Sequence, residues 1–252
     1  MNTFSFISTL GTLFISLTTP SLAYAACGDA PAPQVNWDGC NKEKQIFTKA
    51  DFTAAVLKNI NFSEANLTRA RLSHADFGLA KLNNAILDRV KAKKARFVSA
   101  SLKSAQINNA RLTASTFDRA DFSNAKITNS TLTKGSFYNA MFDNANISAS
   151  DFSYGNFEQA KMIEVQAVGS IFHHAIFSFS TLEDANLANA DFTRAKLDNS
   201  DLSGADFSNA NLEGADLHDA DITNTIFTNA KLGNAIWVNR KRCRPGSIGV
   251  CK

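Results

Sequence analysis

A large apolar residue recurs at every fifth position from Phe47 to Trp237, and this spacing holds through 39 consecutive units. Phe, Leu, Ile, Met or Trp occupies 37 of these positions, and the two exceptions are Ala92 and Ala167. The residue two places earlier is small: the 38 positions from Ala50 to Ala235 hold 26 Ala, six Ser and two Gly. A period of five matches neither the 3.6 residues of a helical turn nor the two-residue alternation of a strand. An ordinary amphipathic helix or strand is therefore excluded along this stretch.

Each five-residue unit turns one large and one small residue inward and three polar residues outward. Four such units can close a coil of about twenty residues that stacks on its neighbours, which is the architecture of a solenoid. Residues twenty apart then lie above one another. One inward column is largely aromatic: Trp37, Leu57, Phe77, Phe97, Phe117, Phe137, Phe157, Phe177, Leu197, Leu217 and Trp237. We expect its six consecutive Phe to stack as a ladder in the core rather than to bind a ligand.

Individual units of the repeat, such as Ala205-Asp206-Phe207-Ser208-Asn209 and Ala215-Asp216-Leu217-His218-Asp219, carry a recognisable pattern. They resemble the pentapeptide-repeat family, whose motif is Ala-Asp/Asn-Leu/Phe-x-x. The resemblance implies an all-β fold, a right-handed quadrilateral parallel β-helix of about ten coils with short, cysteine-stapled caps. We expect a signal peptide, an N-terminal cap, a pentapeptide-repeat β-helix and a C-terminal cap, over residues 1–26, 27–46, 47–239 and 240–252.

The first 26 residues predict a secretory signal peptide. They contain an apolar stretch from Phe4 to Leu17, a helix-breaking Pro20 and the small-residue ending Ala23-Tyr24-Ala25-Ala26, with cleavage expected after Ala25. No Lys or Arg precedes the apolar stretch, so an uncleaved or misassigned amino terminus remains the alternative. The stretch is too short and interrupted for a membrane span. We therefore expect a periplasmic or secreted bacterial protein with no transmembrane span in the mature chain.

The four cysteines lie in two pairs that flank the repeat. Two local disulfides, Cys27–Cys40 and Cys243–Cys251, fit this placement and an exported protein. Zinc binding is the competing explanation, but the spacings are not those of a zinc knuckle and no His lies near either pair. Lipidation of Cys27 is a weaker alternative, because Tyr24 stands where a Leu-like residue is expected. The disulfides would staple the two open ends of the solenoid, whose unpaired edges otherwise favour aggregation.

The net charge of +3 suggests no partner by itself, but the charge is unevenly distributed. Residues 41–111 contain 14 Lys or Arg and five Asp or Glu, whereas residues 112–240 contain eight and 16. Stacking should place six cations along one edge, the basic edge: Lys49, Arg69, Arg71, Arg89, Lys91 and Arg111. Repulsion between adjacent like charges favours a polyanion-binding role. The alternative interpretation is a solvated face that keeps the rod soluble.

A second irregularity lies between Met162 and Phe179, where the motif weakens and apolar residues occupy outward positions. These residues form a candidate patch for a partner or for self-association: Ile163, Val168, Ile171, Ile176 and Phe179. The alternative is a local distortion in which some of the side chains turn inward around Ala167. His173 and His174 adjoin the patch, but successive residues point in different directions, so we expect no metal site.

No catalytic arrangement emerges from the sequence: it has no Gly-rich phosphate loop, no supported Ser-His-Asp order and no lone reactive Cys. The repeat itself explains the many Asp residues. We therefore expect no enzymatic activity and no cofactor, but an exported scaffold or binding protein whose partner is a protein or an anionic envelope polymer. The alternative is the gyrase-protecting subgroup of the same family, cytoplasmic mimics of acidic duplex DNA. The export signal, paired cysteines and basic half argue against it, and we expect no DNA binding by an exported chain.

Overall fold

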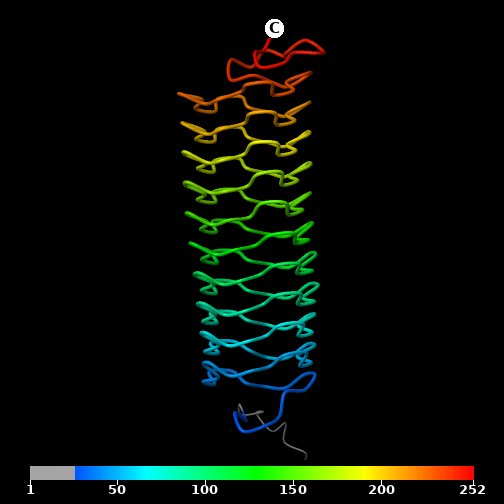
Figure 1. The fold of residues 1–252 in the computed structure, drawn as a ribbon, viewed down its shortest axis with the longest axis vertical. Coiled ribbons are helices and arrows are strands. Elements are labelled where there is room, and N and C mark those ends of the chain that lie inside the picture. Colours follow the sequence, from blue (N-terminus) through cyan, green and yellow to red (C-terminus); the bar gives the residue numbers. More distant parts are fainter. Residues whose placement is uncertain (1–25) are drawn as a thin grey trace, which may run out of the picture.

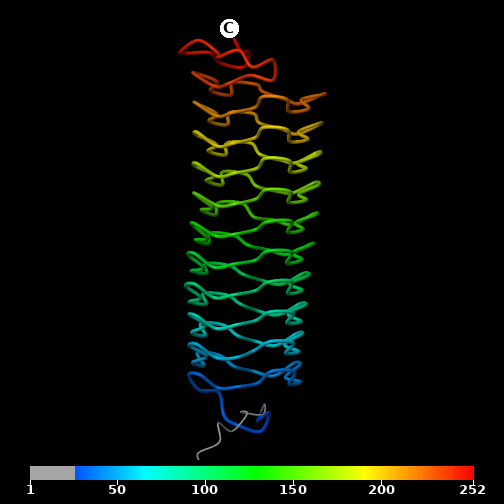
Figure 2. The same cartoon turned by 180° about the vertical axis from the view of Figure 1, so that it is seen from behind.

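A computed structural model describes the protein over residues 26–252. The predicted signal peptide, residues 1–26, lies outside the described residues except for its last residue. The described chain forms one rod of stacked coils, with the amino-terminal and carboxy-terminal segments at opposite ends (Figures 1 and 2). Between residues 26 and 252 there is no helix and no extended strand. The backbone instead pairs through isolated, single-residue bridges.

The bridges define a coil of twenty residues. Parallel bridges join residues 20 apart, beginning with Asn36 and Val56 and ending with Asp216 and Ile236. One bridge falls in each five-residue unit, immediately before the inward apolar residue. Four units therefore complete a coil, and each coil stacks on the next as the five-residue period predicts.

Each side of the coil ends in a tight turn that explains the period of five. In one such turn the carbonyl of Phe47 accepts a hydrogen bond from the N–H of Ala50 at 3.0 Å. The second turn residue, Lys49, has a φ of +64°, which is the arrangement of a type II turn. A residue with positive φ recurs at this place in successive units, and Asn, which tolerates that conformation, is frequent there. One bridge residue, two inward residues and two turn residues make the unit.

The core is the predicted double set of large and small inward residues. Nearly all of them are buried, and their clustering runs the length of the rod. The six Phe of the aromatic column stack face to face over centroid distances of 4.5–5.3 Å. The predicted ladder is therefore confirmed. Stacking between the rings adds to the burial of each ring, which alone contributes about 1.5–3 kcal/mol.

Four of the six serines at the small inward position donate a hydrogen bond to the coil before them: Ser115, Ser130, Ser150 and Ser170. Ser180 and Ser200 instead donate within their own turns. Ser130 Oγ accepts a hydrogen bond from the N–H of Ala110 at 3.0 Å and donates one to the carbonyl of Ile107 at 2.7 Å. The hydroxyl of Ser130 thus connects the first and last residues of a turn in the preceding coil. Ser150 makes the same pair of contacts to Ser130 and Ile127. The hydroxyl of each of these buried serines therefore has a hydrogen-bond partner.

The amino-terminal end begins with a disulfide between Cys27 and Cys40, whose Cα atoms lie 5.5 Å apart. Lys42 stands where the repeat predicts an apolar residue, and the structure explains this departure. Its Nζ lies 4.0 Å from the centroid of the Trp37 ring and donates a hydrogen bond to the carbonyl of Cys27 at 2.6 Å. The cation thus packs over the first buried aromatic ring and contacts the disulfide segment.

The carboxy-terminal end is closed differently, because the chain reverses direction. Lys231 bridges Ile248 and Ile236 bridges Arg242, both antiparallel, and a disulfide joins Cys243 to Cys251. This segment covers two sides of the last coil, seen in red at the top of Figure 1. On the other two sides, three of the four inward residues are only partly buried: Ile222, Thr225 and Phe227.

Candidate polyanion-binding edge

The basic edge lies along one corner of the rod and is built from two kinds of repeat position. Arg69 and Arg89 are turn residues, with φ values of +61° and +59°, and their side chains are exposed. Lys91 and Arg111 are bridge residues just beyond the corner, and Lys91 bridges Arg111 directly. The small buried residues of the corner separate the two columns. Side chains from both columns can therefore converge over the same surface.

Four cations of the basic edge do converge on one groove of about 450 Å³. Its lining consists of Arg69, Arg89, Lys91, Asn109 and Arg111, and no carboxylate belongs to this lining. All four cations are exposed. Stacked coils lie about 4.8 Å apart, so equivalent positive charges are separated by less than a Debye length in physiological salt. The groove is a concentrated patch of positive potential.

The structure separates the other two predicted residues from this groove. Arg71 donates a hydrogen bond to Asp51 Oδ2 at 2.6 Å. The hydroxyl and N–H of Thr53 donate to the other oxygen of Asp51, and these bonds, helped by Arg71, lower the pKa of that carboxyl. Arg71 is thus partly neutralised. Lys49 is exposed at the start of the edge and does not line the groove.

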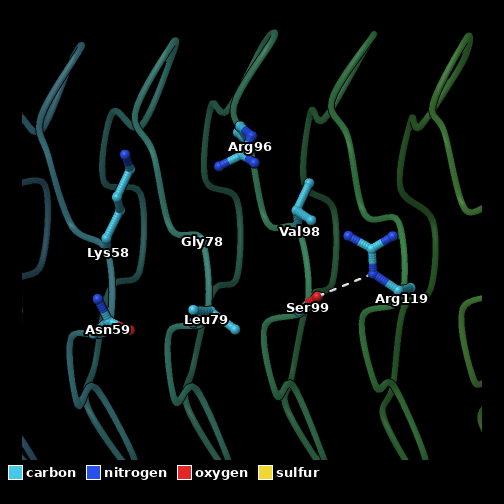
Figure 3. A pocket seen from close by; sticks show the side chains of 8 residues that line it. All are labelled: Lys58, Asn59, Gly78, Leu79, Arg96, Val98, Ser99 and Arg119. Carbon is cyan, nitrogen blue, oxygen red and sulfur yellow. Dashed lines mark hydrogen bonds between the residues drawn. The ribbon is translucent and has the colours of Figure 1, made fainter.

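A second groove, of about 330 Å³, was not anticipated from the sequence (Figure 3). It spans four consecutive coils, three of which contribute a cation: Lys58, Arg96 and Arg119. They occupy three different repeat positions, so they do not form a column that a twenty-residue alignment reveals. The remaining lining residues are Asn59, Gly78, Leu79, Val98 and Ser99.

The five residues of the predicted apolar patch come from four consecutive units, which are the four sides of one coil. Ile171 and Ile176, for example, belong to different bridge columns. Phe179, Ile171 and Val168 are 58%, 40% and 36% exposed, whereas Ile163 and Ile176 are partly buried. Ala167 stays in register with the core, fully buried. The five side chains surround the rod and do not gather on one face.

The histidines near that coil form an aromatic cluster. The rings of Tyr154 and His174 stack at 5.2 Å, and His173 meets both rings edge-on. Burial lowers the pKa of His174, and the charges of His173 and Arg194 lower it further. Residues 26–252 contain no group of His, Cys, Asp or Glu side chains that could hold a metal ion. In the same part of the chain, no helix has the length and apolar character needed to cross a bilayer.

Comparison with known proteins agrees with the repeat geometry. A model of the family described as pentapeptide repeats matches in eight copies, over residues 46–84, 95–133, 105–142, 140–178, 175–214 and 200–236. The chain belongs to the pentapeptide-repeat family. The fold of this family is a right-handed quadrilateral β-helix, and its members are generally non-catalytic. A search of curated proteins found no match.

Several solved structures of pentapeptide-repeat proteins are similar to this one. HetL of the cyanobacterium Nostoc sp. strain PCC 7120, involved in heterocyst differentiation regulation, is 27% identical; the match covers 77% of this chain and 94% of HetL, with a TM-score of 0.46. Trypsin-treated QnrB1, a plasmid-mediated fluoroquinolone resistance protein, is 18% identical over 75% of this chain and 89% of its own, with a TM-score of 0.43. A thylakoid-lumen pentapeptide-repeat protein of Arabidopsis thaliana is 23% identical. The match covers 46% of this chain and 63% of that protein, with a TM-score of 0.17.

Proposed function

We propose that this pentapeptide-repeat protein is an exported, non-enzymatic binding protein whose basic edge holds an anionic envelope polysaccharide. The observation that carries the proposal is the convergence of Arg69, Arg89, Lys91 and Arg111 on one groove whose lining includes no carboxylate. Such a site attracts a negatively charged partner from a distance and holds it by charge-assisted hydrogen bonds. A long polymer suits it better than a small ion, because the cations are spread over several coils.

The shape of the rod supports an extended ligand. The stacked backbone fixes the Cα positions of the cations, so little backbone entropy is lost when a chain binds. The cations also repel one another, and an anion that lies between them relieves this repulsion. A polymer with one charge on each sugar unit would supply several anions in series along the same edge.

Export is supported by residues on both sides of the repeat. The apolar stretch and small-residue ending before Cys27 have the composition of a secretory leader. The two disulfides suit an oxidising compartment. We further propose that the two cysteine-containing segments act as caps, which keep the ends of the rod from pairing with other chains.

The second candidate, a gyrase-protecting mimic of duplex DNA, is favoured by the acidic half of the chain. Residues 112–240 carry 16 acidic and eight basic side chains. The basic half opposes this candidate, because a protein surface that binds DNA is itself positive and would repel the cations of residues 41–111. The polysaccharide proposal accounts for the basic half directly.

The binding test uses heparin, a sulfated polysaccharide, as the probe. Reversing Arg89, Lys91 and Arg111 to Glu should weaken binding in a calorimetric titration at low salt at least tenfold, and raising the salt should weaken binding of the wild-type protein as well. An acidic residue is compatible with these positions, since the turn position of Arg89 holds Glu64 and Glu164 in other units and the bridge position of Lys91 and Arg111 holds Asp76 and Asp121. A matched triple reversal of exposed lysines away from both grooves provides the control: Lys126, Lys134 and Lys196. Equal losses in the two variants would contradict the proposal.

The export test measures the native protein in fractionated cells. An intact mass that lacks residues 1–25 or 1–26, together with no free thiols, is the expected result. A full-length protein in the cytoplasm with four free thiols would contradict export. That outcome would make the gyrase-protecting candidate the better explanation.

A further inference from the structure

We infer that the groove in Figure 3 is a second anion-binding site, so that the rod binds two polysaccharide chains back to back and links them. The inference rests on the proposed function, because it takes the ligand of the second groove to be of the same chemical class. It adds a site that the basic edge does not include.

The two grooves lie on opposite sides of the rod and at the same level along it. Arg89 and Asn109 line the groove of the basic edge, while Ser99 and Arg119 line the second groove. Each residue of the second pair follows one of the first by ten positions, which is half of a twenty-residue coil. The linings span residues 69–111 and 58–119, so the second groove overlaps the full length of the first. One short ligand therefore cannot fill both grooves.

The polar groups of the second groove are arranged for an anion. Lys58 Nζ and a guanidinium nitrogen of Arg96 lie 3.4 and 3.1 Å from the oxygens of Asp76, which orients both cations at one end. Arg119 lies beyond them, and its Nε donates to Ser99 Oγ at 3.4 Å (Figure 3). This bond uses one of the five N–H groups of a guanidinium. Three cations against one carboxylate leave the groove with an excess positive charge.

The floor and one wall of the groove suit a sugar ring. Gly78 stands between the cations, and a Cβ there would lie 3.0 Å from the guanidinium of Arg96 and 3.2 Å from Asp76. Glycine therefore leaves room for the ion pair and keeps the floor open (Figure 3). Leu79 is 61% exposed and, with Val98, adds an apolar surface beside the cations. A charged sugar presents this combination, since it has C–H faces as well as sulfate or carboxylate groups.

Two sites on opposite sides make the rod bivalent for a polymer. Binding of a second chain needs no new contact between the sites, because the rigid solenoid already holds both grooves in place. Long anionic chains should therefore be joined into a network by the protein, whereas short fragments should only occupy the two sites.

The stoichiometry of short heparin fragments tests the inference with the full chain. In calorimetric titrations with heparin tetrasaccharide, the wild-type protein should bind two fragments. Lys58→Glu with Arg119→Glu should bind one, and Arg89→Glu with Lys91→Glu should also bind one. Combining all four changes should abolish binding, whereas the control Lys134→Glu with Lys196→Glu should still bind two. Long heparin should produce turbidity with the wild type and the control only.

The outcomes separate the two proposals. One fragment on the wild type, unaffected by Lys58→Glu with Arg119→Glu, would overturn the second site and leave the basic edge intact. No binding by the wild type would overturn both. Glu158 and Glu164 occupy positions equivalent to those of Lys58 and Arg119, so the reversals fit the repeat. If the double reversal fails to fold by circular dichroism, Arg119→Ala alone should lower the stoichiometry or weaken the second binding step at least tenfold.

Discussion

Phe117 and Phe227 occupy the same place in the repeat, yet their surroundings differ greatly. Phe117 lies between Phe97 and Phe137, whose rings stack on it at 4.9 and 5.3 Å, and it is 1% exposed. Phe227 stacks on Phe207 at 5.5 Å on one side and only meets the tilted ring of Trp237 on the other. It is partly exposed. The comparison teaches that the motif decides the direction of a side chain, whereas the coil on each side decides how much that side chain stabilises the rod.

The largest expected effect is the loss of stability when Phe117, in the middle of the rod, is replaced by Ala. Phe117→Ala should lower the free energy of unfolding by about 3–5 kcal/mol, because it leaves a cavity between two stacked rings. Phe227→Ala should lower it by about 1–2 kcal/mol, because that ring is already partly hydrated and covered on one side. Denaturant titrations of the two variants measure both losses. Equal losses would show that the position of the coil in the rod does not determine how much a Phe ring contributes to the free energy of unfolding.

Removing a disulfide should sharpen the contrast between the ends and the middle. Replacing Cys243 and Cys251 with Ser should destabilise the carboxy-terminal segment by about 2–3 kcal/mol, the loop-closure entropy of such a short ring. Replacing Cys27 and Cys40 is the matched change at the other end. Amide hydrogen exchange should accelerate in residues 221–236 in the first variant, with little change near Phe117. An equal increase in the hydrogen-exchange rate along the whole rod would contradict the view that the disulfide stabilises only the end of the rod.

The buried serines offer a smaller version of the same contrast. Ser130→Ala should lower the free energy of unfolding by about 1 kcal/mol, because its hydroxyl joins two coils. Without the hydroxyl, the N–H of Ala110 can bond to the carbonyl of Ile107 in its own turn. The equivalent N–H of Ser170 bonds to Ala167 in this way, because the residue stacked on Ser170 is Ala190. The hydroxyl of Ser200 instead bonds only to Leu197 in its own turn, at 2.5 Å. Ser200→Ala should therefore cost less, and the order of the two melting temperatures checks this difference.

The smallest expected effect depends on pH and involves Asp121, which is 8% exposed. Burial alone would raise the pKa of Asp121, but hydrogen bonds from Ser123 and the nearby Lys103 lower it below the ordinary value of an aspartate. The carboxylate therefore contributes stability that is complete above its unfolded pKa and is lost as the pH falls through the lower, folded pKa. The contribution should be less than about 1 kcal/mol for a pair with an exposed lysine. Asp121→Asn should reduce stability at pH 7, and unfolding curves at successively lower pH should show this effect shrinking as the carboxyl becomes protonated.

The sequence predicts the core of this protein well because one spacing rule assigns every inward residue. The aromatic ladder, the coil length and the burial of Ala167 all follow from that rule. Lys42 shows its limit: the position is inward by spacing, but the end of the rod lets a cation pack over Trp37. This exception arises because the end coil has no neighbouring coil on one side. A periodic sequence pattern does not show where the stack of coils ends.

The candidate sites could be predicted only where charges share a column. Arg69 and Arg89 do so, and the structure places both in one groove. The pairing of Arg71 with Asp51 reduces its role, because a column alignment does not weigh a neighbouring carboxylate. The second groove was missed because Lys58, Arg96 and Arg119 reach it from different positions on different coils. The five residues of the predicted apolar patch are close in sequence, but the structure distributes them over successive sides of the coil.

The five-residue unit also gives the rod a rotational register. Deleting one unit, such as residues 125–129, would keep the alternation of large and small inward residues but move every later residue to the adjacent side. The acidic half would turn by a quarter of a revolution relative to both grooves, and Phe137 would leave the column of Phe117. Gain or loss of single units therefore redistributes the surface charges around the axis without requiring a new core. In such a rod the angle between two surface features is counted in pentapeptides.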